Sequence, residues 1–213
     1  MRSAGSAARM TVFPKMAASA GQSFVAMMGA GLVALALPAL PVLGQDHAAA
    51  DVAVAEPADY RMTDYRSPVP ASLKGARVID AKEALALHAQ GNTLFIDVYP
   101  RAPKPAGLPA NTIWRSSKHD SIAGAVWLPN VGYGKLAAEP EAYFRSNVER
   151  LTGGDKSKPM VFFCLKDCWM SWNAAKRAMA WGFTQVIWFP DGTDGWREIG
   201  QTIANVEPEP GGG

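Results

Sequence analysis

The chain has 213 residues, of which 21 are lysine or arginine and 19 are aspartate or glutamate. Three of the basic residues, Arg2, Arg9 and Lys15, lie before residue 45, which leaves 18 basic against 19 acidic residues from Gln45 onward. Nothing in this near-neutral balance supports the basic surface that nucleic-acid-binding proteins need, and the two cysteines are too few for a disulfide-stapled scaffold.

The first 44 residues have the pattern of a secretory signal peptide. They contain basic residues and no acidic ones, and residues 24–44 form the uncharged apolar run FVAMMGAGLVALALPALPVLG. That run is long enough to span a membrane, so a retained anchor is the alternative. Because Pro38 and Pro41 interrupt the run near its end and small residues follow, we predict cleavage near residues 44–50. The expected product is periplasmic and has no stable membrane insertion after cleavage.

The 169 residues from Gln45 onward suit one compact domain. We expect an extended lead-in over residues 45–76, a domain over residues 77–203 and a flexible tail over residues 204–213. Strand patterns and helix patterns alternate through the domain, which predicts a mainly parallel α/β sheet flanked by helices. The expected strands are 76–80, 93–98, 125–129, 159–163 and 185–189, and the expected helices are 81–91, 140–151, 171–181 and a short one within 190–200. Residues 100–121 are proline-rich and predict a long ordered loop or an insertion.

Both cysteines lie in the stretch FFCLKDCWMSWNAAKRA, residues 162–178. Cys164 follows a buried strand and precedes a loop that leads into a helix, and sites form at this edge of α/β sheets. Loop N–H groups and the positive end of the helix dipole both favour the thiolate. The pattern therefore predicts an activated cysteine, and the alternative is a buried structural thiol.

Cys168 is open to three interpretations: it resolves a persulfide, forms a disulfide with Cys164, or packs in the core. Cysteines four positions apart in a loop can approach to the Cα separation of a disulfide, about 4.4–6.8 Å. We predict that the pair is bonded or close enough to bond. Because so small a ring restrains little chain, the bond is expected to be reactive rather than structural.

Other residue types in the domain have two interpretations each. Asp97 ends a strand and is expected to accept hydrogen bonds from loop backbone, with acid–base work as the alternative. His119 falls in the irregular segment, where a solvated loop histidine is expected and a metal or proton-transfer role is the alternative. Asp191 and Asp194 are expected to cap a turn and a helix. Two roles are possible for the tryptophans of this region: they pack in the core, or they line a pocket for an apolar or quinoid ligand. These residues are Trp169, Trp172, Trp181 and Trp188.

The chain from about residue 77 to 200 resembles the rhodanese (sulfurtransferase) domain. The similar pieces are LFIDV (94–98), SIAGAVWLP (121–129), VFFC (161–164), AWGFTQVIWF (180–189) and DGTDGW (191–196). More narrowly, YRMTDYRSPVP, WLPNVGYG, CWMSWNAAKRA and DGTDGW are similar to exported rhodanese-like proteins that are named for a Cys-x-x-Cys-Trp motif and associated with PQQ-dependent alcohol catabolism. The chain departs from that motif because three residues separate its cysteines.

The resemblance implies a rhodanese-like fold with a five-stranded sheet and a persulfide on Cys164, with Cys168 as the second catalytic cysteine. It implies no cofactor and no metal, a small sulfur donor and a thiol acceptor, and a periplasmic PQQ-dependent dehydrogenase or its cytochrome as a partner. Lys166 is the only cation of the loop, which lacks the arginine that often binds the substrate oxyanion in this family. The implied substrate-binding loop is Leu165, Lys166, Asp167, Trp169, Met170 and Ser171, and the implied supporting residues are Asp97, Asp191 and Asp194.

Three classes of function are compatible with the cysteine pair. The first is a sulfurtransferase-like enzyme that uses Cys164 as nucleophile. The second is a protein that exchanges thiol and disulfide with a partner. The third is a binding module for a partner or for copper(I), with His119 or Met170 as a third ligand. An inactive scaffold is the remaining possibility.

Overall fold

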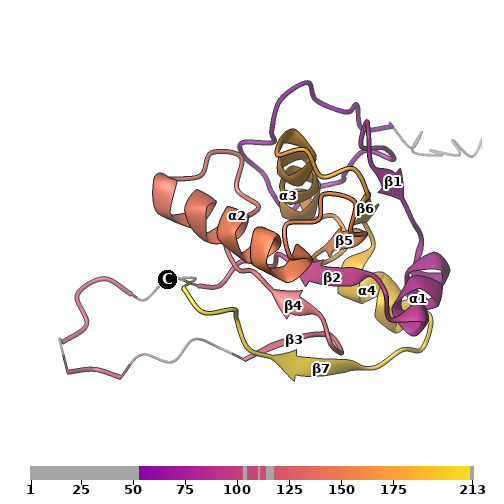
Figure 1. The fold of residues 1–213 in the computed structure, drawn as a ribbon. Coiled ribbons are helices and arrows are strands. Elements are labelled where there is room, and N and C mark those ends of the chain that lie inside the picture. Colours follow the sequence, from indigo (N-terminus) through magenta and orange to yellow (C-terminus); the bar gives the residue numbers. More distant parts are fainter. Residues whose placement is uncertain (1–52, 103–104, 110, 114–117, 212–213) are drawn as a thin grey trace, which may run out of the picture. The chain divides into compact units, whose positions relative to one another are not determined.

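The computed structural model describes residues 53–213 apart from 103–104, 110, 114–117 and 212–213. The expected signal peptide, residues 1–44, lies outside the described residues. A five-stranded sheet has the order β1-β6-β5-β2-β4, and every neighbouring pair in it is parallel. Figure 1 shows helices on both faces of this sheet. Its elements are β1 (Arg77–Val78), α1 (Ala81–Gln90), β2 (Leu94–Asp97), β4 (Val126–Trp127), α2 (Ala138–Thr152), β5 (Met160–Phe163), α3 (Trp169–Ala180), β6 (Val186–Phe189) and α4 (Gly192–Glu198). The expected α/β class and mainly parallel sheet are confirmed.

The strands β5 and β6 are apolar at every position because both faces of the sheet are covered. All four residues of β5 are buried, and so are all four of β6. Since successive side chains of a strand point to opposite faces, each strand contributes side chains to two hydrophobic cores, one on each face of the sheet. Met160 and Phe162 pack with residues of α2 and α3, whereas Val161 and Phe163 pack with residues of α1 and α4.

Local signals in the sequence position the helices. Asp80 caps α1 and accepts a hydrogen bond from the backbone N–H of Glu83, whose side chain in turn accepts one from the N–H of Asp80. This reciprocal capping box satisfies two helix-terminal donors. Gly91 and Gly153 end α1 and α2 in the left-handed conformation, which glycine adopts without steric cost.

A second, two-stranded antiparallel sheet pairs β3 (His119–Ile122) with β7 (Ile203–Val206). Beyond β7, the backbone N–H of Glu209 donates to the Trp127 carbonyl, and the Glu209 carboxylate forms an ion pair with Arg150. The structure therefore differs from the predicted loop over residues 100–121 and from the predicted flexible tail over residues 204–213. The end of the first segment pairs with the start of the second as β3 and β7, and neither strand has a strand pattern in its own sequence.

Residues 60–69, which we call the N-terminal strap, run along α3 (Figure 1). Arg61 exchanges two hydrogen bonds with the Asn173 amide: its N–H donates to Oδ1 at 2.9 Å and its carbonyl accepts from Nδ2 at 2.9 Å. Further along, the Trp169 indole N–H donates to Ser67 Oγ at 3.0 Å and lies 3.1 Å from the Pro68 carbonyl. The strap thereby covers the tryptophan-bearing end of α3.

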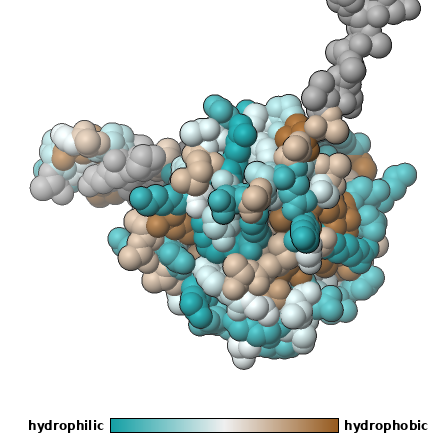
Figure 2. All heavy atoms as spheres, turned by 90° about the horizontal axis from the view of Figure 1, so that it is seen from above, coloured by the Kyte–Doolittle hydropathy of each residue, from teal (hydrophilic) through white to brown (hydrophobic). Residues whose placement is uncertain are grey.

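The described surface mixes polar and apolar side chains. On the face shown in Figure 2, hydrophobic patches are separated by hydrophilic residues. The exposed large hydrophobic residues in the described part of the chain are Met62, Ile113 and Tyr133. No helix in that part is both long enough and apolar enough to cross a bilayer.

Candidate functional site

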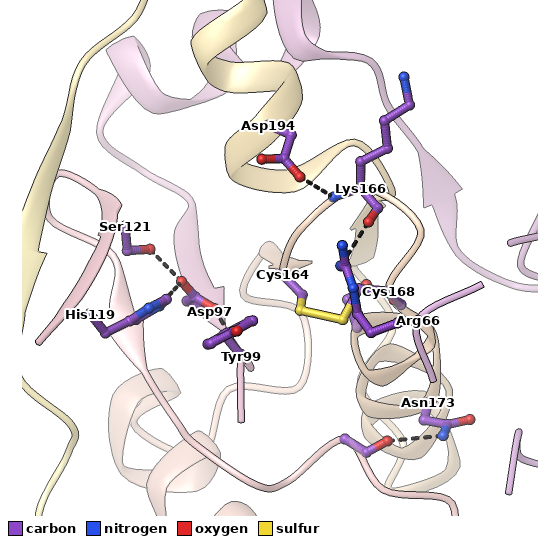
Figure 3. Close-up of a disulfide and its surroundings, with 12 residues drawn as sticks. Arg66, Asp97, Tyr99, His119, Ser121, Cys164, Lys166, Cys168, Asn173 and Asp194 are labelled. Carbon is purple, nitrogen blue, oxygen red and sulfur yellow. Dashed lines mark hydrogen bonds and ion pairs between the residues drawn. A yellow bond between two sulfur atoms is a disulfide. The ribbon is translucent and has the colours of Figure 1, made fainter. Parts of the chain in front are cut away.

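Cys164 lies at the carboxyl end of β5, the fourth strand of the main sheet in chain order. It forms a disulfide with Cys168, and the two Cα atoms are 6.2 Å apart (Figure 3). The predicted proximity of the pair is confirmed. Cys164 is 1% exposed and Cys168 is 2% exposed, so neither sulfur is open to solvent in this state.

The helix that follows begins earlier than predicted. Cys168 is its N-cap residue, and α3 starts at Trp169 rather than at Ser171. Trp169, Met170 and Ser171, which the sequence assigned to the loop, therefore form the first turn of α3. The Cys168 side chain makes no capping hydrogen bond to the helix. The disulfide consequently lies at the positive end of the α3 dipole, and a thiolate formed there is stabilised.

The loop between the cysteines is short and tightly turned. Asp167 has φ of 54°, a left-handed conformation that aspartate tolerates better than most residues. Leu165 is partly buried against the core that contains both cysteines. Ser171 fixes the end of the turn, because its hydroxyl donates to the Cys168 carbonyl at 3.0 Å and accepts from the Trp188 indole at 3.0 Å.

On one side, the first turn of α4 holds the loop. The Thr193 N–H donates to the Cys164 carbonyl at 3.0 Å, and the Lys166 N–H donates to Asp194 Oδ2 at 3.1 Å. Gly192, with φ of 51°, lies so close to the Cys164 carbonyl that a side chain there would collide with it. Asp194 thus supports the loop instead of capping a helix.

Asp191 occupies the N-cap position of α4 but makes no side-chain capping bond, contrary to the sequence prediction. Burial raises the pKa of this carboxyl, and the nearby Lys166 ammonium partly opposes the rise. The carboxylate is therefore held where its charged form is disfavoured.

On the other side, the strap holds the loop. Arg66 pairs with Cys168 in an isolated antiparallel bridge, and the Trp169 N–H donates to the Tyr65 carbonyl at 3.0 Å. The Arg66 guanidinium donates from Nη1 to the Lys166 carbonyl at 2.8 Å. Figure 3 shows Arg66 beside the disulfide. Sequence reasoning noted that the loop lacks an arginine and missed that a residue 100 positions away brings one. The only signal for it was the YRMTDYRSPVP run.

Asp97, at the end of β2, is fully buried and accepts three hydrogen bonds. Its Oδ1 accepts from the Tyr99 N–H at 2.8 Å, and its Oδ2 accepts from Ser121 Oγ at 2.5 Å and contacts His119 Nε2 at 2.7 Å. The predicted bond to loop backbone is present, but most of the network comes from β3. His119 is 8% exposed and lies between the rings of Tyr99 and Trp127, so the prediction of a solvated loop histidine was wrong.

The four tryptophans pack in the core that contains the cysteine pair, as the core interpretation predicts: Trp169, Trp172 and Trp188 are buried, and Trp181 is partly buried. Two surface cavities, of about 520 and 260 Å³, lie elsewhere. The first is lined by Glu56, Pro57, Ala58, Leu73, Lys74 and Lys176, and the second by Arg101, Asn130, Tyr133, Lys135, Leu136, Ala137 and Pro140. In the part of the chain that the structure describes, no three His, Cys, Asp or Glu side chains are grouped to hold a metal ion.

No known protein family and no curated protein matches the chain. Among solved structures, a thiosulfate sulfurtransferase from Pseudomonas aeruginosa is similar over 63% of this chain with 15% identity and a TM-score of 0.41. The match spans 21% of that protein, so this chain corresponds to only about a fifth of its length. An uncharacterized protein from Saccharomyces cerevisiae is similar over 59% of this chain and 93% of its own, with 16% identity and a TM-score of 0.37.

The likeness at these TM-scores is weak, so the class of the protein rests on its own architecture. It is an α/β protein with a five-stranded parallel sheet and a buried cysteine pair at the carboxyl edge of a central strand.

Proposed function

We propose that the protein is a rhodanese-like, sulfurtransferase-type enzyme in which Cys164 carries sulfane sulfur as a persulfide. The observation that carries the proposal is the position of the cysteine pair, between the end of β5 and the N-terminus of α3. A thiolate in this position is favoured by the helix dipole, and it is a strong nucleophile.

The chemistry is a nucleophilic substitution at sulfur. The Cys164 thiolate attacks the outer sulfur of a donor such as thiosulfate, the S–S bond of the donor breaks, and sulfite leaves with the bonding pair. The persulfide anion then passes its outer sulfur to a thiophilic acceptor, which regenerates the thiolate. The Arg66 guanidinium and the Lys166 ammonium are the cations near the loop that can attract an anionic donor.

Cys168 is assigned as the resolving residue. Its thiolate attacks the Cys164 sulfur of the persulfide, which forms the Cys164–Cys168 bond and expels hydrosulfide. The disulfide is then a resting form that must be reduced before another sulfur is loaded. The bond between the two cysteines supports this assignment.

Mass spectrometry after reduction and exposure to thiosulfate tests the proposal. Because Cys168 resolves the persulfide, we expect the reduced parent protein to release hydrosulfide and return to the disulfide, and the unreduced protein to gain no sulfur. Cys164→Ser should abolish loading, whereas Cys168→Ser should load without prior reduction. Sulfur loading that survives Cys164→Ser, or that is lost in Cys168→Ser, would show that Cys164 is not the nucleophile.

The disulfide itself favours a second candidate, thiol–disulfide exchange with a partner. This function needs both cysteines equally and no sulfane donor. Equal loss of activity in Cys164→Ser and Cys168→Ser, measured as reduction of a disulfide-bonded peptide, together with no sulfur loading, would favour it over sulfur transfer.

We also propose that the protein is exported to the periplasm and acts beside a PQQ-dependent dehydrogenase or its cytochrome. The leader pattern of residues 1–44 and the four similar sequence runs support this proposal. Fractionation of cells should recover a shortened chain from the periplasm. Full-length chain that remains in the membrane after a high-salt wash would contradict export with cleavage.

A further inference from the structure

The cysteine pair is enclosed from two sides by segments of unequal burial. The α4 turn contacts Cys164, and the strap contacts Cys168. Residues Gly192, Thr193, Gly195 and Trp196 of α4 are buried. The strap, residues 60–69, has no buried residue along its whole length.

This difference decides which side opens more easily. Segments with few buried contacts and exposed backbone hydrogen bonds open at lower free energy than core elements. Arg61 fastens the first part of the strap to Asn173 of α3. Over the cysteine pair, the strap is held by the bond from the Trp169 N–H, in the first turn of α3, to the Tyr65 carbonyl and by two side-chain anchors. These anchors are the Arg66 Nη1 bond to the Lys166 carbonyl and the bond from the Trp169 indole to Ser67 Oγ.

We propose that the N-terminal strap is a lid over the cysteine pair, and that its opening exposes the Cys168 sulfur first. An incoming thiolate then attacks Cys168: a mixed disulfide forms on Cys168, the Cys164–Cys168 bond breaks, and Cys164 leaves as a thiolate. A second thiolate attacks the mixed disulfide and releases Cys168, so the protein gains two electrons and the two reductant thiols become a disulfide. This inference holds whichever thiol reaction the protein performs.

The site of attack is measured by reducing the oxidised protein with 2-mercaptoethanol in the presence of iodoacetamide, which alkylates the released cysteine before it can attack back. Trypsin cleaves after Lys166 and so separates the two cysteines into the peptides 157–166 and 167–176. We expect the alkyl group on Cys164 and the mixed disulfide on Cys168. The reverse labelling would overturn the assignment of the attacked sulfur.

The lid is measured by the rate of that reduction in Arg66→Ala/Ser67→Ala, which removes the Arg66 anchor and leaves the Trp169 indole only the Pro68 carbonyl as acceptor. When the strap closes faster than the thiolate attacks, the rate follows the open population, and the loss of the Arg66 hydrogen bond raises it by about fivefold. Arg77→Ala is the matched control, since it removes an exposed arginine that pairs with Glu83 in α1. An unchanged reduction rate in the double variant would show that the strap is not a lid over the cysteine pair.

A measurement on the unaltered protein stands even if the double variant does not fold. The Trp169 N–H donates to the strap and the Thr193 N–H donates to the Cys164 carbonyl, so their hydrogen exchange reports opening of the two sides separately. We expect the Trp169 amide to exchange at least about tenfold faster than the Thr193 amide. Slower exchange at Trp169 than at Thr193 would show that α4, and not the strap, opens.

Discussion

At the scale of single residues, the buried network around Asp97 shows what a strand-end carboxylate does here. Three donors from Tyr99, His119 and Ser121 meet its two oxygens, and a buried carboxylate needs such partners because it has lost its water. The sequence predicted a backbone partner for Asp97. It could not predict His119, because that histidine is brought into place by β3, whose pairing depends on β7 at the far end of the chain.

The raised pKa of Asp191 predicts a pH-dependent effect on stability. A carboxyl whose folded-state pKa lies above its unfolded value, about 3.8, stabilises the fold below that pH and loses this contribution as pH rises through the folded pKa. Asp191→Asn should therefore raise the free energy of unfolding at pH 7, by well under about 1 kcal/mol because the carboxyl is only partly buried. The gain should vanish at pH 3 in urea titrations.

Asp155→Asn is the control of opposite sign. Hydrogen bonds from Ser157 lower the pKa of Asp155, so its ionised form stabilises the fold above the unfolded pKa and this contribution is lost as pH falls through the folded pKa. This variant should be less stable than the parent at neutral pH and match it in acid. A loss of stability at pH 7 in Asp191→Asn would mean that its carboxylate is held by partners rather than penalised by burial.

At the scale of elements, Arg177 of α3 ties the helix to the loop after β4. The guanidinium is buried and donates to the carbonyls of Val131, Tyr133 and Gly134 at 3.3, 3.2 and 2.8 Å. Burial lowers the pKa of Arg177, and the side chain lies over the Tyr60 ring at 4.3 Å. One side chain thus joins α3, this loop and the strap.

Arg177→Met should lower the free energy of unfolding by about 3 kcal/mol, because it leaves buried carbonyls without donors. Arg145→Met is the control: its exposed pair with Glu149 on α2 is expected to contribute less than about 0.5 kcal/mol. Urea denaturation of the two variants gives both values. Equal losses would show that the loop finds other donors when Arg177 is removed.

The elements that the sequence predicted are those with a strong period of their own. The apolar runs of β2, β5 and β6 and the capped α1 were located to within a residue or two, because burial on two faces and a capping box leave local marks. The sequence did not predict the pairing of β3 with β7, which the structure shows. Their residues HDSI and IANV have no clear alternation, and an edge ribbon is stabilised by its partner rather than by its own pattern.

At the scale of the whole molecule, the cysteine bond should contribute little to the stability of the fold. It closes a ring of only a few residues, for which the chain-entropy account gives about 2 kcal/mol. Reduction should therefore lower the melting temperature by about 4–8 °C for a domain of this size. Calorimetry with and without reductant measures the shift, and Cys164→Ser/Cys168→Ser should show none on adding reductant. A loss above about 4 kcal/mol would make the bond structural rather than reactive.

The architecture of the whole domain was predictable because strand–helix alternation restricts the topology to parallel crossovers. The cysteine site followed from that architecture, since the carboxyl end of a central strand can be located by counting elements. What surrounds the site did not follow. Arg66 and Thr193 reach the loop from opposite ends of the domain, and only the tertiary fold brings them together.

The partners of the strap lie far away along the chain, and this has a consequence for how the protein folds. Arg61 bonds to Asn173, 112 residues later, and the first strand of the sheet pairs with β6, with Arg77 opposite Ile187. Chains dominated by such non-local pairings fold slowly, because loop closure precedes the contacts that stabilise it. The N-terminal part therefore has no place to dock until almost the entire polypeptide has been synthesised. Closure of the strap over the cysteine loop is consequently a late event in folding.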